Sequence, residues 1–181
     1  CAASTHYNEE FFIGKIHKEL KLKYKNLITI LIPRHVNRSQ SIINELENID
    51  LKIITKSSKK KISKNTDIYI VDTYGETTKF YGLSNITFLG GSMVPHGGQN
   101  PLEPARMGNY ILHGPHIQNF KEIYIMLSKL NVSSKVNNIN NMKKYIIRKI
   151  KYKQPQKVSK KLNFIGNEIL KKNLKVINKY F

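Results

Sequence analysis

The residue types that bind phosphates and sugar hydroxyls are concentrated between residues 90 and 104. Two glycine pairs, Gly90-Gly91 and Gly97-Gly98, permit close backbone approach and positive φ, so their N–H groups can point at an anion. Asn100 is a preferred N-cap residue and Pro101 suits the first position of a helix. A glycine-rich loop that leads into a helix N-terminus is typical of a phosphate site.

Glu103 lies in the first turn of this predicted helix and has two interpretations. Asn100-x-x-Glu103 matches a capping box, in which the glutamate accepts a hydrogen bond from the cap backbone. The other interpretation is that Glu103 binds a ligand. Pro104 favours it, because proline lacks the N–H of the first intrahelical bond and so loosens the turn. A carboxylate freed in this way can bind a ligand and accept hydrogen bonds from both hydroxyls of a vicinal diol.

Two further segments with binding chemistry directly follow apolar runs. Two of the chain's four arginines lie in Pro33-Arg34-His35-Val36-Asn37-Arg38, and arginine is the fork-shaped donor suited to phosphate. A solvated strand end is the alternative for this segment. Asp72-Thr73-Tyr74-Gly75-Glu76 either contacts a nucleotide or simply begins a helix with an acidic first turn.

The six histidines divide by their expected positions. His6, His35, His96 and His116 fall in loops, whereas His17 within a helix and His113 at a strand end are expected to pack. No pair has HxxxH or HExxH spacing and Cys1 is the single cysteine, so neither a metal site nor a cofactor is expected. The sequence also lacks the Walker, GxGxxG and GxSxG patterns.

Short apolar runs alternate with helical patterns along the chain. The expected strands are 27–32, 51–54, 67–71, 86–89, 110–112 and 133–136, and the expected helices are 8–24, 39–48, 76–83, 101–107, 119–130, 138–150 and 155–180. Asn8 is the expected cap of the first helix, Glu9 and Glu10 its acidic first turn, and 56–64 a solvated loop. The chain is expected to begin just after a strand, with a turn at residues 4–6.

This alternation predicts an α/β fold, a Rossmann-like parallel sheet with helices on both faces. In such sheets, ligands bind outside the carboxyl ends of the strands. The expected binding loops are therefore 3–7, 33–38, 72–76, 90–100 and 113–119, where the glycines, histidines and arginines described above lie.

The net charge of +19 is concentrated towards the C-terminus. Residues 121–181 contain 16 Lys and Arg against 2 Asp and Glu, which indicates an anionic partner such as nucleic acid or an acidic membrane surface. Compositional drift is an alternative explanation for much of the charge. Only 4 of the 31 basic residues are Arg, and such an excess of Lys is expected of a protein encoded by an AT-rich genome. No apolar run approaches the roughly 20 residues of a membrane span, so a soluble or peripheral globular domain is expected.

Six motifs together resemble the C-terminal half of the 3-deoxy-D-manno-octulosonic acid (Kdo) transferase family, over about residues 1–137. They are Ala3-Ser4-Thr5-His6, Pro33-Arg34-His35-x-x-Arg38, Asp72-Thr73-x-Gly75-Glu76, Gly90-Gly91-Ser92, Pro95-His96-Gly97-Gly98-x-Asn100-Pro101-Leu102-Glu103-Pro104-Ala105 and Gly114-Pro115-His116-x-x-Asn119-Phe120. The sequence departs from the family at Tyr74, where Met is usual, and at Gln99, where His is usual.

The resemblance implies the C-terminal half of a GT-B glycosyltransferase, which moves Kdo from CMP-Kdo to a lipid A precursor of the lipid IVA type. It places the enzyme at the cytoplasmic face of the bacterial inner membrane, peripheral or anchored through its N-terminal half. The implied CMP contacts are Pro33, Arg34, Tyr74, Gly75, Glu76, Asn100, Pro101, Leu102 and Glu103. Weaker donor-site candidates are Ser4, Thr5, His6, Arg38, Gly91, Ser92, His96 and His116.

The family's reaction is an inverting displacement whose base, a glutamate, belongs to the N-terminal domain and is not in this chain. This half is expected to stabilise the departing phosphate through Arg34, the glycine-loop N–H groups and the helix N-terminus, without a metal. The fragment alone is therefore expected to be inactive. Residues 138–181 are expected to form basic helices that pack on the domain, on the N-terminal half or on the anionic membrane.

Other function classes remain open on the residues alone. A basic nucleic-acid-binding domain fits the charge, although Trp is absent and no recognition motif is present, and the family resemblance implies no nucleic acid partner. A GT-B transferase that uses another nucleotide sugar is a second alternative. A fragment without ligand affinity is the third.

Overall fold

A computed structural model describes residues 1–178, apart from the side chain of Lys172. Seven strands form one sheet in the order β3-β4-β2-β1-β5-β6-β7, and all neighbouring strands are parallel. The strands are β1 Ala2–Thr5, β2 Thr29–Pro33, β3 Ile53–Thr55, β4 Ile68–Ile70, β5 Ile86–Leu89, β6 Tyr110–His113 and β7 Ser133–Lys135. The helices are α1 Glu9–Lys23, α2 Ser39–Glu47, α3 Thr77–Tyr81, α4 Leu102–Arg106, α5 Lys121–Lys129, α6 Ile139–Lys149 and α7 Gln156–Ile177, with short 3₁₀ helices at Val36–Arg38 and Gln118–Phe120.

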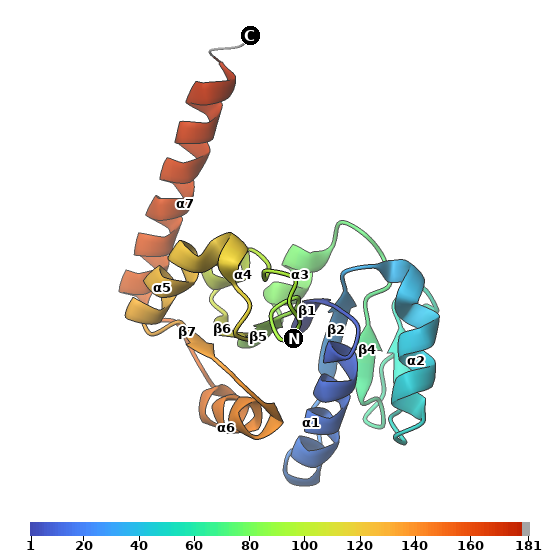
Figure 1. Ribbon diagram of the computed structural model, residues 1–181. Coiled ribbons are helices and arrows are strands. Elements are labelled where there is room, and N and C mark those ends of the chain that lie inside the picture. Colours follow the sequence, from blue (N-terminus) through green and yellow to red (C-terminus); the bar gives the residue numbers. More distant parts are fainter. Residues whose placement is uncertain (179–181) are drawn as a thin grey trace.

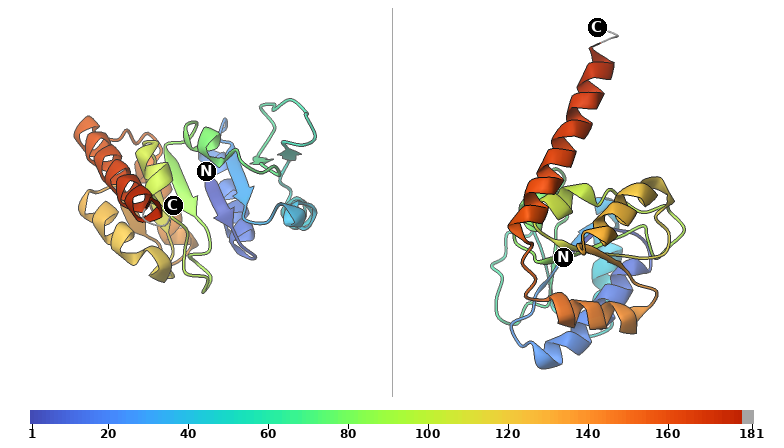
Figure 2. Two further views of the ribbon diagram at one scale, coloured as in Figure 1. Left: turned by 90° about the horizontal axis from the view of Figure 1, so that it is seen from above. Right: turned by 90° about the vertical axis from the view of Figure 1, so that its left-hand side faces the viewer.

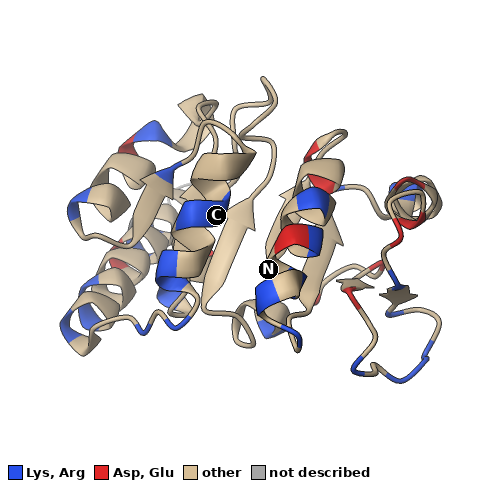
Figure 3. Cartoon of the chain, turned by 90° about the horizontal axis from the view of Figure 1, so that it is seen from below, with Lys and Arg blue, Asp and Glu red and all other residues tan. Residues whose placement is uncertain are grey.

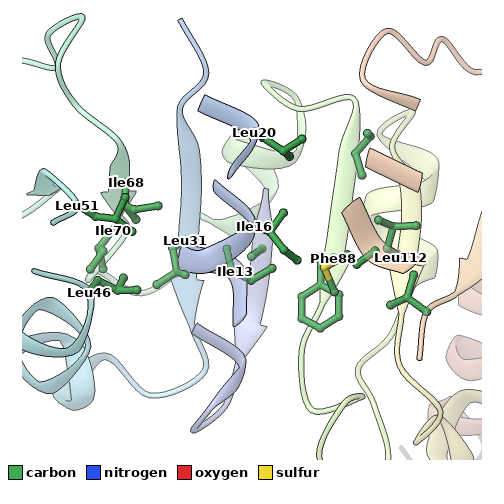
Figure 4. Packing of buried hydrophobic residues seen from close by; sticks show 14 of the residues in the cluster. Ile13, Ile16, Leu20, Leu31, Leu46, Leu51, Ile68, Ile70, Phe88 and Leu112 are labelled. Atoms are coloured by element: carbon green, nitrogen blue, oxygen red, sulfur yellow. The ribbon is translucent and has the colours of Figure 1, made fainter. Parts of the chain in front are cut away.

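The central strands are buried on both faces because consecutive side chains enter different cores. Leu31 and Ile70 join one core, shown in Figure 4, while their neighbours Ile32 and Val71 join the other. Strands of this kind consist of uninterrupted apolar residues, which is why short apolar runs identified most of them in the sequence. The predicted α/β fold, a parallel sheet with helices on both faces, is confirmed.

Each core is closed by a separate set of helices (Figure 1). Helices α1, α2 and α6 cover one face, where Ile16, Leu46 and Met142 are buried against the sheet. Helices α3, α4, α5 and the first turns of α7 cover the other face, to which Tyr124 and Leu162 contribute. The lysine-rich segment 57–65 is exposed, as predicted for a solvated loop.

The start of the chain differs from its prediction. Ala2–Thr5 is not a turn after a strand but strand β1, paired with β2 on one side and β5 on the other. The apolar pattern did not reveal this strand, because Ala2, Ala3 and Ser4 are small residues without strong β-propensity. Asn8 adopts φ 73° and makes no side-chain capping bond, so the predicted N-cap of α1 is wrong.

The two C-terminal helices differ in how far they are buried. Helix α6 packs against the sheet, whereas α7 begins on the domain and then extends away from it (Figures 1 and 2). Leu162 is buried, but Phe164, Leu170 and Leu174 on α7 are exposed. None of the described helices is long and apolar enough to cross a membrane. The division of the chain after residue 137 stays a prediction.

Candidate functional site

The loops that carry the sequence motifs meet at the carboxyl edge of the sheet. The strand order reverses direction between β1 and β5, and α/β sheets bind ligands at such a switch point. Hydrogen bonds connect the loops directly: Arg34 N–H donates to the Thr5 carbonyl at 3.0 Å, and His116 N–H donates to the Ser92 carbonyl at 2.9 Å. The candidate site is therefore built by the ends of β1, β2, β4, β5 and β6.

Contrary to the prediction from the sequence, the first glycine pair does not offer its N–H groups to an external anion. The Glu9 carboxylate already occupies this position: Oε2 accepts from Gly91 N–H at 2.8 Å, and Oε1 accepts from Ser92 N–H at 3.1 Å and Met93 N–H at 2.9 Å. Oε2 also accepts from His6 N–H at 2.9 Å, and Glu9 is only 1% exposed. The resident carboxylate fixes the loop, so Gly91 and Ser92 are structural rather than phosphate donors.

Gly90 is required by close packing between β1 and β5. A Cβ at this position would lie 2.4 Å from the Ser4 carbonyl oxygen, 2.5 Å from Thr5 Cα and 2.7 Å from the Glu9 carboxylate. All three distances are shorter than van der Waals contact. The glycine therefore lets the end of β5 approach the end of β1 and the Glu9 carboxylate.

Three imidazoles converge at this edge, and His6, His35 and His96 are called here the histidine cluster. The ring of His6 lies 4.1 Å from that of His96 and 6.2 Å from that of His35, measured between centroids. His35 and His96 are exposed, whereas the His6 side chain is 12% exposed. Burial lowers the pKa of His6 below its ordinary value, and the neighbouring His96 lowers this pKa further.

The two arginines of the 33–38 segment have different surroundings. Arg38 forms a bidentate pair with Glu10, at 3.0 and 3.2 Å, and the Glu10 side chain is 0% exposed. Its guanidinium therefore joins the start of α1 to the start of α2, which argues against its prediction as a donor-site residue. Arg34 is exposed and follows Pro33, the buried last residue of β2.

The segment after β4 is also held by internal contacts. Glu76 accepts from Lys56 at 2.5 Å, Thr73 at 2.7 Å and Lys79 at 3.3 Å. The hydrogen bond from Lys56, followed by that from Thr73, lowers the pKa of Glu76 to about 2. Glu76 thus has its own cationic partners, while Tyr74, 75% exposed, and Gly75 remain open at the surface.

Asn100 and Glu103 do not form a capping box with each other. Asn100 Oδ1 accepts from Leu102 N–H at 3.0 Å, whereas the exposed Glu103 carboxylate accepts from the Thr78 hydroxyl at 2.5 Å. Helix α4 begins at Leu102, so the N–H that Pro104 lacks is one that needs no intrahelical acceptor. The argument that Pro104 loosens the turn is therefore wrong, although the carboxylate does point away from its own cap.

A hollow of about 450 Å³ lies between α4 and α7 beside this carboxylate. Thr78, Asn100 and Glu103 line it together with residues of α7, including Asn163 and Gly166. The Arg106 side chain links the two helices, because Nε donates to Asn163 Oδ1 at 3.2 Å and the guanidinium lies over Gly166. The C-terminal helix thus borders the candidate site, which its sequence did not predict.

The remaining predicted residues divide into buried and exposed positions. The side chains of Pro33, Pro101 and Leu102 are buried, so they shape the site from beneath. Ser4 and Thr5 belong to β1, and His116 is half-buried. His17 and His113 are buried, as expected for packing residues. Within residues 1–178, no group of three or more His, Cys, Asp or Glu side chains has the arrangement of a metal site.

Several known proteins that are similar to this chain in sequence are Kdo transferases. The 3-deoxy-D-manno-octulosonic acid transferase of Haemophilus influenzae is 40% identical over 136 residues, which are 75% of this chain and 32% of that protein. The transferase of Rickettsia bellii is 34% identical over 185 residues, which cover 99% of this chain and 44% of that protein. The chain thus spans less than half the length of these curated relatives. No protein-family model matches it.

A solved structure extends the similarity to the fold. The crystal structure of the C-terminal CMP-Kdo binding domain of WaaA from Acinetobacter baumannii matches with a TM-score of 0.79 and 26% identity, over 90% of this chain and 83% of that one. This chain is a homologue of the Kdo transferase C-terminal domain. The resemblance predicted from the six sequence motifs is confirmed, and Kdo transferases are glycosyltransferases.

Proposed function

We propose that this chain is the donor-binding part of a Kdo transferase of GT-B architecture, with CMP-Kdo as its donor. The observation that supports this most directly is the similarity to the CMP-Kdo binding domain of the Acinetobacter enzyme, with a TM-score of 0.79. The motif loops also meet at the carboxyl edge, where Arg34 and Glu103 are both exposed. The comparisons favour this function over a nucleic-acid-binding domain.

In the proposed complex, the exposed residues of the motif loops contact CMP. Arg34 pairs with the phosphate, Glu103 accepts from the ribose hydroxyls, and Tyr74, Gly75 and Asn100 lie at the surface around them. Because Glu9 occupies the N–H groups of Gly91, Ser92 and Met93, Arg34 supplies the charge that stabilises the departing CMP. No metal or cofactor is required in this arrangement.

The proposed acceptor is a lipid A precursor at the cytoplasmic face of the inner membrane. Its hydroxyl attacks the anomeric carbon of Kdo, the bond to the phosphate oxygen breaks, and CMP leaves. The base that removes the hydroxyl proton is a glutamate of the enzyme's N-terminal domain, outside the residues of this chain. We therefore expect the chain to bind CMP weakly and to transfer no Kdo by itself.

Nucleotide binding by calorimetry tests this function and the role of Glu103. CMP is expected to bind more tightly than UMP or GMP, and loss of the 2′-hydroxyl in dCMP is expected to weaken binding about tenfold or more, since a charge-assisted hydrogen bond contributes about 1.5–3 kcal/mol. Glu103→Ala should bind CMP at least as weakly as the unaltered chain binds dCMP, and it should no longer prefer CMP to dCMP. Glu122→Ala, which removes an exposed carboxylate from α5, is the matched control and should bind like the unaltered chain.

Two results would contradict the proposal in different ways. Equal binding of CMP and dCMP by the unaltered chain would show that Glu103 does not read the ribose. Tighter binding of a uridine or guanosine nucleotide would favour a transferase that uses another nucleotide sugar.

A further inference from the structure

The His6 ring has a fixed tautomer in this fold. Nδ1 lies 3.1 Å from the Ser4 carbonyl oxygen, which can only accept a hydrogen bond. Nδ1 must therefore carry the proton, and in the neutral ring Nε2 presents a lone pair. Burial lowers the pKa of His6, as do His96 and His35, while the Ser4 carbonyl and Glu10 raise it. The net direction is down, so the ring is neutral at neutral pH and Nε2 is an acceptor.

Nε2 is buried and has no hydrogen-bond partner among the described residues. Most buried polar atoms are paired, and an unpaired one costs about 1–3 kcal/mol. An atom in this state at a ligand-binding edge is suited to a partner that arrives with the ligand. A neutral imidazole lone pair accepts from O–H or N–H groups and repels carboxylates, so a hydroxyl fits it and an anion does not.

The backbone around His6 is shaped to hold this ring in place. Ser4 adopts φ 54°, and the register of β1 against β2 shifts between Ala3 and Thr5. Left-handed non-glycine residues and bulges of this kind re-aim side chains and recur beside active sites. Glu9 fixes the other side, because its carboxylate accepts from the N–H of His6 as well as from the glycine loop.

The exposed His96 side chain lies against the His6 ring, at 4.1 Å between centroids. Its backbone is held by a turn, with His96 N–H donating to the Val94 carbonyl at 2.7 Å. Rotation of this single side chain therefore changes access to His6 without moving the loop.

We propose that His6 Nε2 accepts a hydrogen bond from a hydroxyl of the sugar carried by the nucleotide, once the His96 side chain turns aside. This inference rests on the proposed function, because it assigns part of the same site to the sugar rather than to CMP. His6 is then a specificity residue for a polyhydroxylated sugar.

Asparagine at position 6 separates the two nitrogens, because its side-chain amide retains the donor to the Ser4 carbonyl and lacks Nε2. His6→Asn is expected to lower the affinity of the chain for a non-hydrolysable CMP-Kdo analogue about 3–10-fold, the loss of one neutral hydrogen bond, and to leave CMP affinity unchanged. His35→Asn makes the same change in an exposed ring and should retain the ratio of the two affinities. His96→Ala should bind the analogue at least as tightly as the unaltered chain.

Equal losses of CMP and analogue affinity in His6→Asn would overturn the inference, because His6 would then be structural only. A loss in His96→Ala equal to that in His6→Asn would also overturn it, since His96 itself would then hold the sugar. Net proton uptake on binding of the analogue, present in the unaltered chain and absent in His6→Asn, would also overturn the inference, because the ring would then bind the sugar's carboxylate as an imidazolium. Calorimetry in buffers of different ionisation enthalpy measures this uptake.

A measurement without nucleotide keeps this inference separate from the proposed function. In the chain labelled with ¹⁵N-histidine, the Nε2 resonance of His6 should move in the direction of an accepted hydrogen bond when free Kdo is added. A shift with Kdo but no binding of CMP would support the sugar contact and contradict the nucleotide site. No shift with either Kdo or the analogue would overturn the sugar contact, even if CMP binds.

Discussion

Three carboxylates near the candidate site hold the loops instead of the ligand. Glu9 accepts four backbone N–H groups from two loops, Glu10 pairs with Arg38, and Glu76 pairs with Lys56. A carboxylate that is fully paired inside the protein gains nothing from a phosphate and repels one. At the scale of single residues, the ligand chemistry is left to the exposed Arg34 and Glu103 and to the unpaired nitrogen of His6.

Replacement of Glu9 by Gln tests whether this carboxylate holds the glycine loop. The amide has one acceptor oxygen and turns an NH₂ group towards backbone N–H donors, which leaves buried groups unpaired. We expect the free energy of unfolding to fall by about 3–5 kcal/mol, measured by denaturant titration. Glu47→Gln makes the same change on the exposed end of α2 and should alter stability by less than about 0.5 kcal/mol. A Glu9→Gln protein as stable as this control would contradict the role assigned to Glu9.

Close contact between the ends of β1 and β5 determines the shape of the site at the scale of elements. Gly90 permits this contact, and the paired strands place His6 next to the glycine loop. The bulge at Ser4 then directs the His6 ring to its position. The two strands and their connecting loops therefore form one unit, which a side chain at position 90 should disrupt.

Gly90→Ala is expected to destabilise the fold by about 2 kcal/mol or more, because its Cβ meets backbone atoms of Ser4 and Thr5 that cannot move aside. Nucleotide affinity should fall as well, since the end of β1 must shift. The control is Gly82→Ala at the end of α3, where the nearest atom to an added Cβ is 3.4 Å away. Thermal unfolding of both variants gives the comparison. Equal stability of the two would show that the end of β1 yields easily.

Sequence patterns predicted the elements more fully than the contacts between them. Apolar runs and helical spacing identified β2, β4, β5, β6 and the helices, because burial of these central strands on both faces imposes a largely apolar sequence. The edge strands β3 and β7 are less buried, and β7, Ser133–Lys135, contains no apolar residue. Strand β1 was missed, since Thr5 is its only β-branched residue and Ala2, Ala3 and Ser4 have no strong β-propensity. The partner of Glu9 lies 82 residues further along the chain, at Gly91, so no local pattern could identify it. Arg38, the partner of Glu10, lies 28 residues further along the chain, so no local pattern could identify this pair either.

The positive charge is distributed unevenly over the whole molecule. Figure 3 shows Lys and Arg along the helices and also along the loop between β3 and β4. Around the connection between α6 and α7, Lys151, Lys153, Lys157 and Lys160 are all exposed. Only some apolar residues of these two helices are available to a membrane, because Leu162 is buried while Ile147, Ile169 and Leu170 are exposed. We propose that this end of the molecule meets the anionic inner membrane.

Vesicle co-sedimentation of two matched variants tests whether the lysines around the α6–α7 connection, or only the net positive charge of the chain, attract it to an acidic membrane. The first variant replaces Lys151, Lys153, Lys157 and Lys160 by Gln, and the second makes the same change at Lys59, Lys60, Lys61 and Lys64 in the exposed loop before β4. Each lysine near an acidic leaflet contributes about 1 kcal/mol, so the first variant should lose at least tenfold in partitioning onto phosphatidylserine vesicles, and the loss should shrink as salt screens the charges. The second should lose much less, because its lysines lie on the other side of the fold, beside the edge strand β3. Equal losses in the two variants would mean that only the net charge matters, and that the helices α6 and α7 have no particular place at the membrane.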